Sequence, residues 1–225
     1  MARAFDPLVR VAVTLHKYAQ IGLGALQSDP DALRNTAESL TIAERSGDDF
    51  LLAFAHLARG MTLIAREGAE RESGFEHLRR ARQASLDGGA NASTVQITDI
   101  QLARQQGELG DLDGAIALSS AVVDELFDLG AMLWRGPATT VLVEALLSRN
   151  REGDLRAARA AIERLTAVPT DSGYVLHEIA LLRLRALVAR AEGDEDAYRR
   201  LAARYRTMAA SCGFEGHQAI ASAMT

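Results

Sequence analysis

The sequence predicts an all-α protein made of repeated helical hairpins, and the spacing of its glycines is the first reason. Two interleaved series recur at intervals of 40–43 residues: Gly68, Gly110, Gly153 and Gly193, and Gly47, Gly88, Gly130, Gly173 and Gly213. A fixed period of this length is typical of repeat arrays. Glycines of the two series alternate about every 20 residues, which suits one helix and its turn. Because no segment alternates as a strand does, we expect about five antiparallel hairpins with a unit of about 42 residues.

Prolines and glycines mark the helices of the first hairpin. Asp6-Pro7 places a capping residue before a first-turn proline and opens a helix expected to reach about Gln27. The segment Asp29-Pro30-Asp31 breaks the chain and starts a second helix. That helix ends at Ser46-Gly47, because glycine takes the left-handed conformation at no steric cost.

The rest of the chain repeats this arrangement. Further helices are expected at about 50–67, 70–87, 93–109, 112–129, 133–150, 155–168, 172–192 and 195–212. Pro137 marks either a helix start at Gly136-Pro137 or a kink one turn into a helix. The predicted hairpins span about 7–47, 48–88, 91–130, 131–168 and 171–213, with a C-terminal cap at 214–225. We expect one repeat domain over residues 1–225.

Composition narrows the class of protein. Apolar residues make up 48% of the chain, enough to form a core, and the net charge of −5 disfavours nonspecific binding to nucleic acid. The longest apolar run near the start, Val11–Leu15, is far too short to span a bilayer. With Cys212 as the only cysteine, no intramolecular disulfide can form. We expect a cytoplasmic protein that binds neither membrane nor nucleic acid.

Motifs for catalysis or cofactor binding are missing from the sequence. The phosphate-binding loop Gly-x-x-x-x-Gly-Lys-Ser/Thr is absent, and no histidine pair has zinc-protease spacing. His16 and His56 could face each other across adjacent helices, although ordinary surface or core histidines are the simpler interpretation. The segment 111–114 lacks the further acids of a calcium loop. We therefore expect no enzyme activity, cofactor or metal.

A short sequence motif recurs at the turn inside three of the predicted hairpins: Gly110-Asp111-Leu112-Asp113-Gly114-Ala115, Gly153-Asp154-Leu155-Arg156-Ala157-Ala158 and Gly193-Asp194-Glu195-Asp196-Ala197. It resembles the tetratricopeptide turn, in which a glycine–acid pair joins two helices and a small residue follows five positions later. Ala115 and Ala158 fit that small position, whereas Tyr198 departs from it. The resemblance implies a right-handed solenoid, here with a unit longer than the usual 34 residues.

The chain also resembles the C-terminal helical arrays of bacterial signalling proteins that contain an adenylate or guanylate cyclase, or a signal-transducing, maltose-regulator-like ATPase. The segments that carry this resemblance are Leu133-Trp134, 137–139, 143–147, Tyr205-Arg206 and 213–217. It implies a regulatory protein–protein interaction module whose partner carries the cyclase or ATPase domains. A domain that senses a small molecule for a transcriptional or cyclase regulator is the alternative.

The tetratricopeptide register predicts which residues line a partner-binding groove. Counted back from Gly110, Gly153 and Gly193, they are Ile97, Ile100 and Arg104, then Thr140, Val143 and Leu147, then Arg183, Leu187 and Arg190. Large apolar surfaces with arginines are typical of interaction sites, so we expect Arg104, Arg183 and Arg190 to meet acidic groups. The alternative is that a longer unit coils tightly and these residues pack against neighbouring helices.

Two further surfaces are candidates for contact with a partner. Trp134 and Arg135 belong to the residue types that dominate interfaces, although a lone tryptophan at a helix start is more often part of a core. The first helix is apolar almost all round, with Leu8, Val11, Leu15 and Leu23 among its residues. A helix of this kind is expected to be covered, which predicts a homodimer or a domain contact through residues 8–26.

Overall fold

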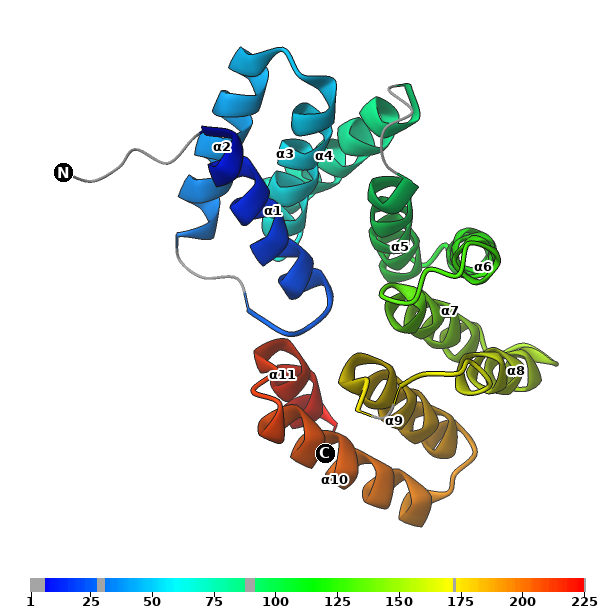
Figure 1. Ribbon diagram of the computed structural model, residues 1–225. Coiled ribbons are helices and arrows are strands. Elements are labelled where there is room, and N and C mark those ends of the chain that lie inside the picture. The colour runs from blue at the N-terminus through cyan, green and yellow to red at the C-terminus, as the bar shows by residue number, and fades with distance from the viewer. Residues whose placement is uncertain (1–6, 28–30, 88–91, 172, 225) are drawn as a thin grey trace. The chain divides into compact units, whose positions relative to one another are not determined.

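The computed structural model describes residues 7–27, 31–87, 92–171 and 173–224, and this part of the chain is helical throughout, with no strand (Figure 1). The helices are α1 (Pro7–Gly22), α2 (Ala32–Ser46), α3 (Asp49–Leu63), α4 (Gly68–Asp87), α5 (Ala92–Glu108), α6 (Leu112–Asp128), α7 (Arg135–Arg149), α8 (Asp154–Thr166), α9 (Val175–Ala191), α10 (Glu195–Ser211) and α11 (Glu215–Ala223). The all-α prediction is confirmed. Helix ends lie within about four residues of the expected ones, except that α1 ends at Gly22 instead of Gln27.

The helices form two compact units, Met1–Thr98 and Asp99–Thr225. The sequence predicted one repeat domain and did not predict this division. Each unit is described separately below.

Left-handed residues end the helices, as the glycine series predicts. Gly88 lies outside the described residues. The other glycines of the two series all have φ between 57° and 89°: Gly47, Gly68, Gly110, Gly130, Gly153, Gly173, Gly193 and Gly213. Asn150 is the one described residue other than glycine with positive φ, at 49°, and it ends α7. Asparagine tolerates this conformation better than most side chains do.

The aspartates of the recurring turn cap the helices that follow. Asp111 Oδ1 accepts a hydrogen bond from the Gly114 N–H at 3.0 Å, and Asp194 Oδ1 accepts one from Ala197 at 2.9 Å. Each bond satisfies an amide that has no partner in the first turn of a helix. Asp154 departs from this arrangement, because it is the first residue of α8 and accepts from the Arg151 N–H at 2.8 Å.

The first unit is built on the close packing of α3 against α4. A Cβ atom added to Gly74 would lie 2.7 Å from the Ile64 backbone nitrogen, so only glycine fits there without movement. Helix α1 packs on α2 and α3. Val11, Ala43 and Ala55 are buried together where these three helices meet.

The second unit stacks its helices in chain order. Helix α7 packs on α6, α8 and α9, and α9 in turn packs on α8 and α10 (Figure 1). The C-terminal helix α11 covers α10 and completes a core that includes Ile179, Tyr198 and Tyr205. Pro137 is the third residue of α7 and lies in its first turn, where a missing N–H costs nothing. Pro137 therefore lies at the start of a helix and does not kink one.

Arginine–carboxylate ion pairs join successive helices of the second unit. Arg149 binds Asp113 of α6 at 2.5 Å and Asp154 of α8 at 2.6 Å. Further pairs join Arg159 to Glu192 at 2.5 Å, and Arg164 to Asp124. Planar guanidinium groups suit such carboxylate contacts.

Candidate binding site

A groove opens along the odd-numbered helices of the second unit, and we call it the odd-helix groove. Its volume is about 490 Å³. Helices α5, α7, α9 and α11, together with the start of α6, supply its lining: Ala103, Arg104, Gly107, Glu108, Leu112, Val141, Glu144, Ala145, Ser148, Arg183 and Ile220. The wall therefore combines small apolar side chains with two arginines and two glutamates.

An ion pair between Arg183 and Glu144 joins α9 to α7 in the wall of this groove. The Arg183 side chain is only 16% exposed, and that of Glu144 is 34% exposed. Arg183 Nε is buried and, among the described residues, has no hydrogen-bond partner. A second carboxylate or carbonyl oxygen could use this donor, because a guanidinium group offers five N–H bonds.

Tyr205 is buried within reach of the same charges. Its hydroxyl lies 2.7 Å from His217 Nδ1. Burial raises the pKa of Tyr205 to about 12; Arg183 lowers it and Glu144 raises it by smaller amounts. Tyr205 is therefore neutral at physiological pH and serves as a hydrogen-bonding core residue.

The structure brings two residues of the predicted groove, Arg104 and Arg183, into the odd-helix groove. The apolar Ile97, Ile100 and Val143 and the polar Thr140 are buried instead, as expected if these residues pack against neighbouring helices. Leu147 and Leu187 are half-buried and do not contribute to the lining. Arg190 also lies outside the lining, with its guanidinium 5.4 Å from the centroid of the Tyr198 ring.

A longer turn explains why the predicted residues of α7 are wrong. Gly110 and Gly193 stand two residues beyond the ends of α5 and α9, whereas Gly153 stands four residues beyond the end of α7. Counting back from Gly153 therefore displaces the register by two residues. Shifting Val143 and Leu147 by two gives Val141 and Ala145, which line the groove, whereas Thr140 shifts to Ala138, which is buried and does not line it. The signal that was missed is Asn150, which ends α7 in the left-handed conformation.

The predicted patch at Trp134 and Arg135 is corrected, because both residues are buried. Arg135 Nε donates to the Leu126 carbonyl at 3.2 Å, and its guanidinium lies 4.6 Å from the centre of the Phe127 ring. The arginine thus satisfies a carbonyl at the end of α6, where helices leave such groups without partners. Its role is to hold the α6–α7 turn.

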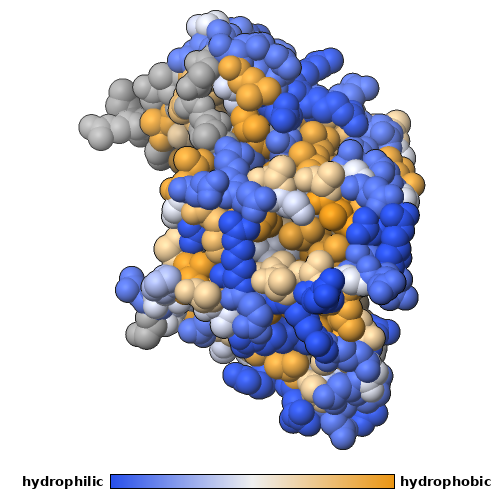
Figure 2. Space-filling view, turned by 90° about the vertical axis from the view of Figure 1, so that its right-hand side faces the viewer, coloured by the Kyte–Doolittle hydropathy of each residue, from blue (hydrophilic) through white to orange (hydrophobic). Residues whose placement is uncertain are grey.

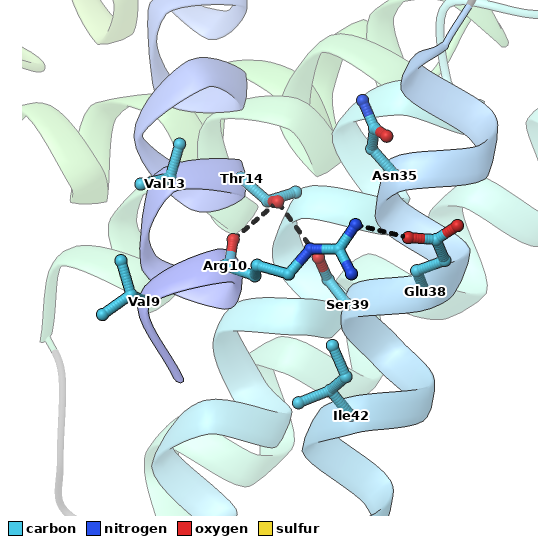
Figure 3. A pocket seen from close by; sticks show the side chains of 8 residues that line it. All are labelled: Val9, Arg10, Val13, Thr14, Asn35, Glu38, Ser39 and Ile42. Carbon is cyan, nitrogen blue, oxygen red and sulfur yellow. Dashed lines mark hydrogen bonds and ion pairs between the residues drawn. The ribbon is translucent and has the colours of Figure 1, made fainter. Parts of the chain in front are cut away.

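The first helix is partly covered by the chain itself. Val11 and Leu23 are buried and Leu15 is half-buried, so Val11 and Leu23 cannot meet a partner as predicted. The side chain of Leu8 lies outside the described residues. Val9 and Val13 are the exposed apolar residues of α1, at 43% and 63%. They border a groove of about 280 Å³ between α1 and α2, which we call the α1–α2 groove (Figure 3).

Two histidines of the first unit meet, though not the pair considered from the sequence. His56 of α3 and His77 of α4 lie with their Nδ1 atoms 2.9 Å apart. Burial lowers the pKa of both, and that of His77 falls to about 4, helped by His56, Arg59 and Arg80. One ring therefore donates and the other accepts, with neither charged at neutral pH.

The described residues contain no group of three or more His, Cys, Asp or Glu that could hold a metal ion. Within the same part of the chain, no helix is long and apolar enough to cross a bilayer. Hydrophilic side chains cover much of the face in Figure 2, and apolar ones reach the surface between them.

The described residues form an all-helical protein with a groove lined by both polar and apolar side chains. Comparisons of the chain with models of protein families, with curated proteins and with solved structures found no match. The resemblance to cyclase- and ATPase-linked arrays therefore stays a prediction.

Proposed function

We propose that this chain is a non-catalytic helical-repeat module that binds a protein partner in the cytoplasm, as a regulatory part of a bacterial signalling system linked to a cyclase or an ATPase. The observation that supports the proposal best is the odd-helix groove. Successive helices supply its wall, so a segment of another protein could contact several hairpins at once.

The charges of the groove favour a partner segment with an acidic group. Arg183 pairs with Glu144, and the 16% of its side chain that is exposed can approach an incoming carboxylate; its buried Nε becomes available only when the side chain shifts. Apolar side chains such as Val141 and Ile220 also line the groove and offer contact to the rest of the segment.

The test uses cyclase and signal-transducing ATPase proteins of the source organism as binding probes, with affinity measured by biolayer interferometry. The Arg183→Glu variant is expected to bind roughly tenfold or more weakly, because it removes the donor and places two acids together. The matched control is Arg199→Glu on α10, where the arginine is 71% exposed and pairs only locally with Asp196. It should bind like the wild type.

A charge swap separates recognition from folding. The double variant Arg183→Glu, Glu144→Arg restores the ion pair with its direction reversed. If the double variant folds and still fails to bind, Arg183 itself contacts the partner. If it binds as well as the wild type, the pair serves only the fold and the proposal is wrong.

A small-molecule sensor is the second candidate, because the groove volume of about 490 Å³ lies within the range of ligand pockets. Thermal-shift measurements against nucleotides, sugars and acyl-CoAs would detect such a ligand. A rise in melting temperature that Arg183→Glu abolishes and Arg199→Glu keeps would favour the sensor over the protein-binding module.

A further inference from the structure

The α1–α2 groove has the form of one half of a symmetric interface. Figure 3 shows Val9 and Val13 on α1, along one side of the groove. They are one helical turn apart and form an exposed apolar ridge. On the other side, α2 supplies Ile42 to the lining. A ridge and a groove therefore lie next to each other on one patch.

The floor of the groove can be covered without losing hydrogen bonds. Ser39 Oγ donates to Thr14 Oγ1 at 3.0 Å, and Thr14 Oγ1 donates to the Arg10 carbonyl at 2.8 Å (Figure 3). Burying a hydroxyl is costly only when it lacks such a partner. An apolar side chain that enters the groove thus meets the hydroxyl groups of Thr14 and Ser39 with their hydrogen bonds already made.

The charges of the patch are balanced. Arg10 Nη2 of α1 lies 2.9 Å from Glu38 Oε2 of α2, and both side chains remain about half exposed. Two like patches that face each other often repel, because each brings the same net charge. Here one cation and one anion border the groove, so each Arg10 can also approach the Glu38 of a second copy.

We propose that the α1–α2 groove pairs with the same groove of a second copy of this chain. Val9 and Val13 of each copy enter the groove of the other, and the Arg10–Glu38 pairs form its charged rim. A two-fold interface needs a patch that is complementary to itself, with ridge, groove and both charges on one surface. This patch meets that requirement. The pairing uses none of the residues of the odd-helix groove.

The mass of the full chain in solution, measured by light scattering after size-exclusion chromatography, tests the proposal. The wild type is expected to be a dimer at micromolar concentration. Val13→Arg is expected to raise the dissociation constant roughly tenfold or more, because it places a charge in each groove. The matched control is Leu129→Arg in the second unit, since Leu129 is 60% exposed and Val13 is 63% exposed. It should leave the dimer intact.

A charge series tests the geometry of the pair. Arg10→Glu places four acids at the rim of a dimer and should weaken it. The double variant Arg10→Glu, Glu38→Arg should restore association, because the patch again carries one charge of each sign. A monomeric wild type would overturn the proposal, and so would a dimer that Val13→Arg leaves unchanged. Since Arg183→Glu should remain dimeric, failure here is distinct from failure of the proposed function.

Discussion

The two units of this protein hold their helices together in different ways. In the first, α3 and α4 approach so closely that a methyl group on Gly74 would collide with the backbone of the facing segment. In the second, arginines reach from one helix to a carboxylate on the next, as Arg149 does toward Asp113 and Asp154. Close backbone contact depends on the size of side chains, whereas ion pairs depend on their charge.

This difference has a consequence for tolerance to change. A packed helix pair has no room for an added atom, because protein interiors are filled to the density of organic crystals. An arginine–carboxylate contact lies nearer the surface and tolerates changes of size around it. It is sensitive to pH and to neutralisation of either partner. Substitutions can therefore probe the two units independently.

The largest effect is expected from adding one methyl group to the tight contact. Gly74→Ala should lower the free energy of unfolding of the first unit by about 1–3 kcal/mol, because the new Cβ must displace the Ile64 backbone nitrogen 2.7 Å away. Amide hydrogen exchange by mass spectrometry should show the loss in α3 and α4. The matched control is Gly107→Ala in α5, whose Cβ would meet Ala115 at an ordinary 3.7 Å. It should be neutral or stabilise the protein by up to about 1 kcal/mol.

A smaller effect is expected from neutralising the buried carboxylate of the second unit. Asp154 has a side chain only 5% exposed, and hydrogen bonds from Arg149 and the Arg151 N–H lower its pKa from 3.8 to about 2. The stability it contributes is present above pH 3.8 and is lost as pH falls through about 2. Asp154→Asn should lower the melting temperature by several degrees at pH 7 and by little near pH 2.

The control for this variant lies in the same network. Asp113 pairs with Arg149 and Arg151, yet its side chain is 59% exposed. Exposed ion pairs contribute little to stability. Asp113→Asn should therefore cost clearly less than Asp154→Asn. Equal costs would contradict the idea that burial decides the strength of this network.

The smallest effect is expected from acid acting on the histidine pair of the first unit. The pKa of His77 falls from 6.5 to about 4 on folding, so the unfolded chain binds a proton that the folded chain does not. Stability should decrease as pH falls from 6.5 to about 4 and level off below that. His56, Arg59 and Arg80 face His77 and oppose its protonation, whereas Glu76 favours it.

Hydrogen exchange at several pH values would localise this effect. Protection in α3 and α4 should weaken toward pH 4 more than protection in α9 and α10. His77→Gln should flatten the pH dependence, because an amide can hydrogen-bond His56 without titrating. An unchanged slope in that variant would assign the acid sensitivity to other groups.

The helices could be predicted from the sequence because their ends are encoded locally. Glycines that must be left-handed and aspartates that accept amide hydrogen bonds mark nearly every boundary. The division into two units could not be predicted, because it depends on contacts between residues far apart in the chain. The same holds for the meeting of His56 with His77, which lie on successive helices that no short motif connects.

The odd-helix groove was predicted only in part, for a physical reason. Arg104 and Arg183 lie in the lining of the groove, whereas Ile97, Ile100, Leu187 and Arg190, predicted by the same count on the same two helices, do not. On α7 the count started too late, since Asn150 already ends that helix. The carboxylates that line the groove, Glu144 above all, belong to no sequence motif. Glu144 could be identified only from the structure, which places it beside Arg183.

The turn after Asn150 indicates where residues can be inserted into this chain. Helix α7 keeps its face toward the groove even though its turn holds one residue more than the turns after α5 and α9. Additional residues placed between Asn150 and Asp154 would be absorbed outside the helices. Loop insertions are tolerated best at exposed sites of this kind. This segment is therefore a natural place to graft a reporter peptide or a fluorescent tag without adding residues to the lining of the odd-helix groove.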